Sequence, residues 1–241
     1  MKALRNLFIL LVVIVIVGVV VPNDIRTGYL TYWYGRIIDT TSGDIGKAAA
    51  WYHRATDAMP GNATFARAYA SSLNDMADGF PEDSENKTDY YLKALEFAKG
   101  WIEANEGSPE VWQLLVEQAR AEWGLGRKNS AKVAIDEAVE LMPTDYIALV
   151  YQGIIWRDMQ PDNRNMVAKS IPIFEQAIQV RRESRTSWAH YELAVAYNML
   201  KDEARALNEL EQALAQWPPR ELRFKIERLK HHIQSSGRST R

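Results

Sequence analysis

Residues 187–218 have the sequence SWAHYELAVAYNMLKDEARALNELEQALAQWP, and they show the organisation of the chain most clearly. Small and large apolar residues recur there at helical spacing on two successive segments: Leu193, Ala194 and Tyr197, then Ala206, Leu210 and Ala213. A polar break at Lys201-Asp202 separates the two segments, and Pro218 ends the second one because proline cannot continue a helix. The stretch therefore predicts two helices joined by a short turn.

This pattern resembles the tetratricopeptide repeat (TPR), a helix–turn–helix unit of about 34 residues. The TPR pattern has a large residue, Leu-Gly and Tyr in its first helix, followed by Ala, an apolar residue, Ala and Pro in its second. Here His190 takes the first large position and Ala194 replaces the glycine. Small residues let the two helix backbones approach closely. One such hairpin cannot bury its own apolar face, so the resemblance implies an array of stacked hairpins.

Less regular copies of the pattern precede this stretch. They are marked by four sets of residues: Ala48, Tyr52, Ala55 and Pro60; Ala66, Tyr69, Ala70 and Leu73; Ala131, Ile135, Ala138 and Pro143; and Leu149, Gly153 and Trp156. We predict five units, at 29–60, 61–108, 109–144, 145–186 and 187–218. The expected fold class is therefore all-α, a TPR-type α-solenoid over residues 29–218, and an irregular helical bundle is the alternative.

Residues 219–234 are predicted to form a capping helix. Leu222, Ile226, Leu229 and Ile233 recur at helical spacing, and repeat arrays need a terminal helix to cover the last apolar face. Residues 220–241 also hold seven Lys or Arg against two Glu, so contact with anionic lipid or an acidic partner is a second use for this helix. A disordered tail is expected over 235–241.

Residues 1–28 are predicted to form an N-terminal membrane anchor. An unbroken apolar run over 7–21 follows Lys2 and Arg5, which fits either a cleaved secretory signal or a short transmembrane helix. No small-residue cleavage motif follows, and Pro22 would stand at the new N-terminus after the nearest match. We therefore expect residues 7–22 to remain and to span the membrane.

The charges around this segment predict its orientation. Lys2 and Arg5 precede it, whereas Asp24 and Arg26 nearly cancel on the other side, so the positive-inside rule places the N-terminus in the cytoplasm. In a bacterium, the repeat domain would then lie in the periplasm, beyond the inner membrane. Large aromatic residues that follow are suited to the membrane–water interface or, alternatively, to the first core helix: Tyr29, Tyr32, Trp33 and Tyr34.

Composition excludes several classes of function. The chain has no cysteine, so disulfides, thiolate metal sites and thiol catalysis are excluded. It contains no phosphate-binding glycine loop, no G-x-S-x-G and no H-E-x-x-H motif, and a formal net charge of -2 does not favour nucleic acid. The acidic stretch 78–89 lacks the spacing of a calcium loop. We therefore predict no catalytic residues, metal, cofactor or nucleic-acid partner.

The TPR resemblance implies a scaffold that binds proteins on the concave surface built by the first helices. The repeat register predicts eleven groove residues: Arg67, Asn74, Gln113, Glu117, Arg120, Val150, Ile154, Arg157, Tyr191, Val195 and Asn198. The three arginines are suited to pair with carboxylates of a bound peptide, or alternatively with charges inside the array.

Two functions agree with these patterns. In the first, the protein is a membrane-anchored scaffold that serves as an accessory or structural subunit of a membrane or cell-envelope complex. In the second, it is a transient assembly or quality-control factor that binds client segments in the groove. Self-association through exposed repeat faces is a further possibility for such an array.

Overall fold

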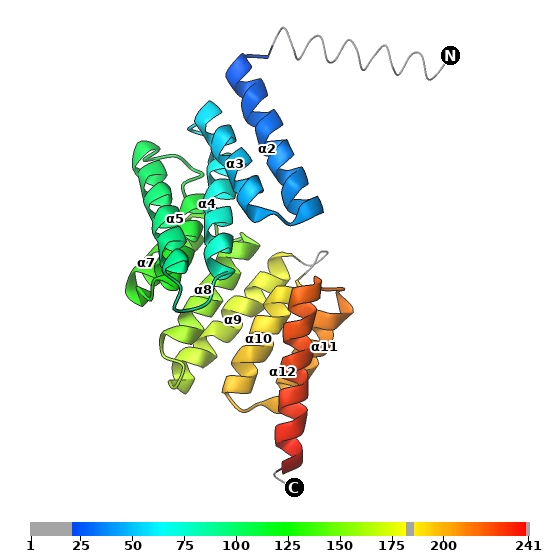
Figure 1. Cartoon of the computed structure of the whole chain (residues 1–241). Coiled ribbons are helices and arrows are strands. Elements are labelled where there is room, and N and C mark those ends of the chain that lie inside the picture. Colours follow the sequence, from blue (N-terminus) through cyan, green and yellow to red (C-terminus); the bar gives the residue numbers. More distant parts are fainter. Residues whose placement is uncertain (1–20, 182–185, 240–241) are drawn as a thin grey trace, which may run out of the picture. The chain divides into compact units, whose positions relative to one another are not determined.

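The computed structural model describes residues 21–181 and 186–239, and these residues form eleven α-helices and no strand (Figure 1). The predicted all-helical fold class is confirmed for this part of the chain. The helices are α2 (Asn23–Ser42), α3 (Ile45–Ala58), α4 (Ala63–Asp78), α5 (Glu85–Ala104), α6 (Trp112–Gly124), α7 (Lys128–Leu141), α8 (Tyr146–Met159), α9 (Arg164–Val180), α10 (Ser187–Met199), α11 (Glu203–Ala215) and α12 (Arg220–Ser239).

Residues 1–20 of the predicted anchor lie outside the described residues, which include only the last two positions of the range 7–22. The last six residues of the predicted anchor, 23–28, belong to α2. Among the helices of the described ranges, none has the length and apolar character needed to cross a membrane.

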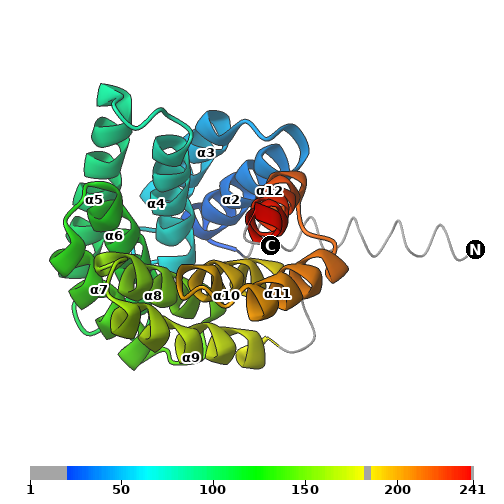
Figure 2. The ribbon, with the colours of Figure 1, turned by 90° about the horizontal axis from the view of Figure 1, so that it is seen from below.

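The helices are grouped in two compact units, residues 1–125 and 126–241. In unit 1, α2 pairs with α3 and α4 with α5, while α6 packs against both α4 and α5. In unit 2, α7 packs on α8, α8 pairs with α9, α10 with α11, and α12 covers α11 (Figure 2). The boundary between the units falls at Leu125–Gly126, inside the predicted third repeat, so that repeat contributes α6 to one unit and α7 to the other.

Short polar side chains begin many of these helices. At five N-termini a side-chain oxygen accepts a hydrogen bond from a backbone N–H in the first turn, at Asp44, Asn62, Asp145, Asn163 and Asp202. Each bond satisfies a donor that has no partner inside its helix. The caps therefore fix where most hairpin turns end.

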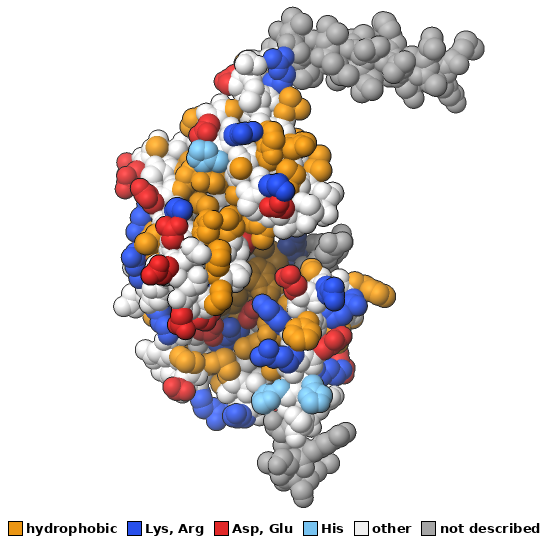
Figure 3. All heavy atoms as spheres, viewed as in Figure 1, with side chains coloured by type: hydrophobic (Ala, Val, Ile, Leu, Met, Phe, Trp, Pro, Cys, Tyr) orange, Lys and Arg blue, Asp and Glu red, His pale blue; other side chains and the backbone are white. Residues whose placement is uncertain are grey.

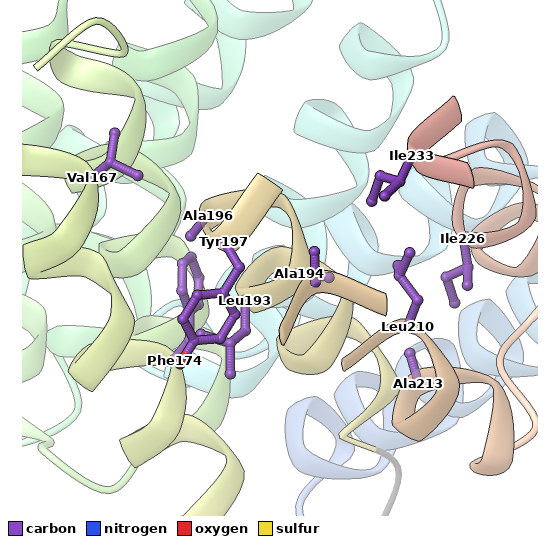
Figure 4. Packing of buried hydrophobic residues seen from close by; sticks show 11 residues of the cluster. Val167, Phe174, Leu193, Ala194, Ala196, Tyr197, Leu210, Ala213, Ile226 and Ile233 are labelled. Carbon is purple, nitrogen blue, oxygen red and sulfur yellow. The ribbon is translucent and has the colours of Figure 1, made fainter. Parts of the chain in front are cut away.

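Small residues let the paired helices lie close together in unit 2. Ala194, Ala206 and Ala213 are completely buried, as the repeat pattern predicted. Figure 4 shows Phe174 of α9 beside Leu193 and Tyr197 of α10, all members of one core cluster. The same cluster continues through α11 to α12, so successive hairpins share one apolar interior.

Gly153 in α8 is a second point of close approach. A Cβ atom built on Gly153 would overlap the ring of Phe174, which comes from the paired helix α9. The position corresponds to the glycine of the TPR pattern. The absence of a side chain there makes room for a fully buried aromatic ring.

The apolar face of α12 packs as the sequence predicted. Ile226 and Ile233 are buried, and Leu222 and Leu229 pack against the same cluster. The expected disordered tail over 235–241 is wrong for its first residues, because α12 continues to Ser239. No proline interrupts residues 220–239, and the Ser235 hydroxyl donates to the carbonyl of His232 at 2.9 Å, so the helix extends beyond the buried Ile233.

Substitution of Gly153 tests the close approach of α8 and α9. Gly153→Ala should lower the free energy of unfolding by about 1–3 kcal/mol, because the added methyl group overfills a packed core. Gly100→Ala in α5 is the matched control, since no heavy atom lies within 4 Å of a Cβ built there. The control substitution should raise the free energy of unfolding by up to about 1 kcal/mol, because alanine has a higher helix propensity than glycine. Urea unfolding followed by circular dichroism measures both values, and stabilisation by both substitutions would contradict the packing described here.

Candidate interaction surfaces

Four predicted groove residues of unit 1 are bound to one another around Glu117. The Asn74 Nδ2 atom donates to the Glu117 carboxylate at 3.1 Å and to its backbone carbonyl at 3.0 Å. Arg120 donates to the same carboxylate at 3.0 Å, and the Nε atom of Arg67 lies 3.5 Å from it. Asn74 and Glu117 are buried. These contacts favour the alternative in which the polar residues hold the array together.

Arg120 connects α6 to α4. Besides Glu117, its guanidinium donates to Ser71 at 3.1 Å, to Asp75 at 2.7 Å and to Asp78 at 3.3 Å. Only 9% of the Arg120 side chain is exposed. A buried charge needs such partners, because its loss of hydration is otherwise uncompensated. A client carboxylate at Arg120 would have to displace existing carboxylates, and the role of this residue in partner binding stays a prediction.

Arg157 makes the equivalent connection in unit 2. Its Nε and Nη2 atoms donate to Asp158 at 2.6 and 2.9 Å, and Nη1 donates to Glu192 of α10 at 2.7 Å. Burial alone would lower the pKa of Arg157, but the hydrogen bonds and charges of Asp158 and Glu192 outweigh it and raise the pKa. The guanidinium therefore stays charged and ties α8 to α10.

The other predicted groove residues divide between core and surface. Val150 is completely buried and packs in a cluster with Leu149, Ala177 and Ala189, so its assignment to the groove is wrong. It lies on the side of α8 that faces α9 and α10. The remaining residues are half-buried: Gln113, Ile154, Tyr191, Val195 and Asn198.

The aromatic residues of α2 lie on two different faces of the helix. Tyr32 is half-buried and packs on the rings of Phe65 and Tyr52, with centroids 4.8 and 5.7 Å apart. Gly28 and Gly35 on the same helical face bring that face against α3 and α4. The assignment of Tyr32 to a membrane interface stays a prediction.

The opposite face of α2 presents large apolar side chains to the surface. Their exposed fractions range from 48% to 64%, for Tyr29, Leu30, Trp33, Tyr34 and Ile37. We call these five residues the α2 apolar face. Three of them were predicted to contact a membrane interface, and that role stays a prediction.

A pocket of about 800 Å³ in unit 2 brings together three of the predicted groove residues and a wall that the prediction did not include. It is lined by Arg157 of α8, by Tyr191 and Val195 of α10, and by one face of α12. The predicted groove included only the first helices of the repeats. The basic composition of residues 220–241 was the feature of the sequence that pointed to the α12 wall of this pocket. Within the described residues, no group of three His, Asp or Glu is arranged to hold a metal ion.

Substitution of Arg120 tests the polar cluster of unit 1. Arg120→Met should lower the free energy of unfolding by about 3 kcal/mol, because the buried Glu117 loses a charged partner. Lys47→Met is the control in the same unit, since Lys47 pairs with Asp44 and its side chain is 75% exposed. The control should change stability little, because exposed ion pairs contribute little. Equal unfolding midpoints for both variants in urea would refute the structural role of Arg120.

Comparison with known proteins supports the fold. No protein-family model matches the chain, and no curated protein matches it. A thermophilic TPR protein of Thermus thermophilus matches with a TM-score of 0.59 and 18% identity, over 85% of this chain and 96% of that one. The Cut9–Hcn1 hetero-tetramer of the APC/C matches with a TM-score of 0.65 and 15% identity, over 86% of this chain and 37% of that one. Yeast Tom70 matches with a TM-score of 0.60 and 14% identity, over 90% of this chain and 42% of that one. The chain therefore has the fold of TPR proteins.

Proposed function

We propose that the protein is a scaffold that holds partner proteins at a membrane, as an accessory or structural subunit of a membrane or cell-envelope complex. TPR-type hairpins stack into surfaces that suit protein binding. The similar Cut9–Hcn1 structure is itself a hetero-tetramer. The α2 apolar face is the single observation that carries the proposal.

The α2 apolar face supports a fixed contact. A monomeric soluble protein seldom gathers several half-exposed large apolar side chains on one helix, and such patches mark protein or membrane contacts. Tyr29, Trp33 and Tyr34 combine an apolar ring with a polar atom, which suits both a protein interface and the headgroup region of a bilayer. In this proposal residues 7–22 anchor the chain, the N-terminus lies in the cytoplasm, and the repeats lie in the periplasm.

The internal pairing of the predicted groove residues supports a fixed subunit over a client-binding factor. Arg120 and Arg157 are mostly buried and already contact carboxylates within their own units. These arginines are therefore poorly placed to capture transient clients. The pocket of unit 2 favours the alternative function, because it offers an open site that a client segment can enter.

Fractionation of the native cells tests the membrane location. The full-length chain should sediment with membranes and resist extraction by high salt and alkaline carbonate, because a spanning segment is not released by either treatment. A variant that lacks residues 1–22 should move to the soluble fraction. Recovery of the full-length chain in the soluble fraction would refute the anchor.

Purification in mild detergent tests the role as a subunit. A fixed subunit should bring down a set of membrane proteins in stoichiometric amounts. The triple variant Tyr29→Ser, Trp33→Ser, Tyr34→Ser should lose that set, because it removes most of the α2 apolar face. The matched control Leu92→Ser, Val133→Ser, Leu141→Ser removes three exposed apolar side chains elsewhere and should retain it. Many substoichiometric proteins, unaffected by the first variant, would instead support the client-binding alternative.

A further inference from the structure

The pocket of unit 2 has a basic wall that the capping helix supplies. Lys225 and Arg228 of α12 are exposed, line the pocket, and form no ion pair with the residues that the structure describes. Lys230 on the same helix contrasts with them, because it contacts Glu211 at 3.1 Å. His231 and His232 extend the wall toward the end of the helix. Figure 3 shows basic side chains and histidines gathered over α12.

The opposite wall offers little negative charge to compensate for these cations. Glu192 is the one carboxylate among the described lining residues. It is buried and bonded to Arg157 at 2.7 Å and to the indole N–H of Trp188 at 3.0 Å. Lys225 and Arg228 therefore face a pocket whose single acid is already engaged, and an anionic ligand would complement them.

The pocket also contains apolar and hydrogen-bonding surface. Val195 and Leu229 are half-buried in its walls, and the ring of Phe224 is 66% exposed at the same site. Burial raises the pKa of Tyr191, so its hydroxyl stays protonated near neutral pH. The hydroxyl has no hydrogen-bond partner within the described part of the chain and is suited to donate to a carboxylate.

We propose that this pocket binds an acidic peptide segment of a partner protein, in which a carboxylate side chain neighbours a large apolar one. Lys225 and Arg228 would pair with the carboxylates, while Phe224, Val195 and Leu229 would pack on the apolar side chain. The apolar surface distinguishes this ligand from a free inorganic anion. The walls of the pocket come from three helices, which suits a peptide segment better than a flat lipid surface. The inference rests on the proposed scaffold role and is independent of the membrane location.

Selection from a displayed library of random dodecapeptides tests this proposal with the full-length chain in mild detergent. The selected peptides should be enriched in Asp or Glu next to an aromatic or large aliphatic residue. A labelled copy of the best peptide then gives a dissociation constant by fluorescence anisotropy. The double variant Lys225→Ala, Arg228→Ala should weaken binding at least about tenfold, because it removes two charge-assisted contacts.

The control keeps the same charge change on the same helix. The variant Arg223→Ala, Lys230→Ala alters two cations that do not line this pocket and should leave the affinity within about twofold, because charges that do not touch the peptide contribute little to its binding. Phe224→Ser should lower the affinity for the peptide without changing how that affinity depends on salt concentration.

Three results would overturn the proposal. The first is a library that gives no acidic–apolar motif. The second is a selected peptide whose affinity falls equally in the pocket variant and in the control. The third is binding to vesicles of anionic phospholipid that depends on Lys225 and Arg228 while no peptide is selected, since this would assign the basic wall to lipid. None of these results affects the outcome of the fractionation experiment. The proposed peptide site and the proposed membrane location can therefore be refuted separately.

Discussion

The close approach of helix backbones within each hairpin determines much of this structure. Alanine and glycine occupy the crossing points, and the rings of Phe174 and Tyr197 fill the space that they leave. Because a bulky residue at Gly153 would drive α8 and α9 apart, the apolar clusters that run through successive hairpins depend on a few positions with almost no side chain. The hairpin geometry in turn brings the polar residues of neighbouring first helices together.

Ion pairs of two mostly buried arginines then connect one hairpin to the next. Arg120 joins α6 to α4, and Arg157 joins α8 to α10, each through carboxylates on both helices. The cost of leaving such a charge unpaired is high, whereas a well-paired buried charge adds little net stability. The pairs are therefore better understood as fixing the relative position of neighbouring helices than as a source of large stabilisation.

The sequence predicted the paired helices because these depend on local periodicity, small residues and proline positions. It predicted the apolar face of α12 for the same reason. It could not predict which groove charges are internal, since that depends on pairing between helices, such as Asn74 with Glu117 across 43 residues. Tyr32 and Trp33 are adjacent and both aromatic, yet Tyr32 packs on Phe65 and Tyr52 while Trp33 is exposed, because the packing of Gly28 and Gly35 decides how α2 is rotated.

The position of α12 has a consequence for local unfolding. Repeat arrays open from their ends, because a terminal element has a neighbour on one side only. Detachment of α12 would uncover Leu210 and would also dismantle the basic wall, so the intact pocket exists only while this helix is docked. Any ligand held there would be thermodynamically linked to the docked state and would slow the fraying of the array at this end.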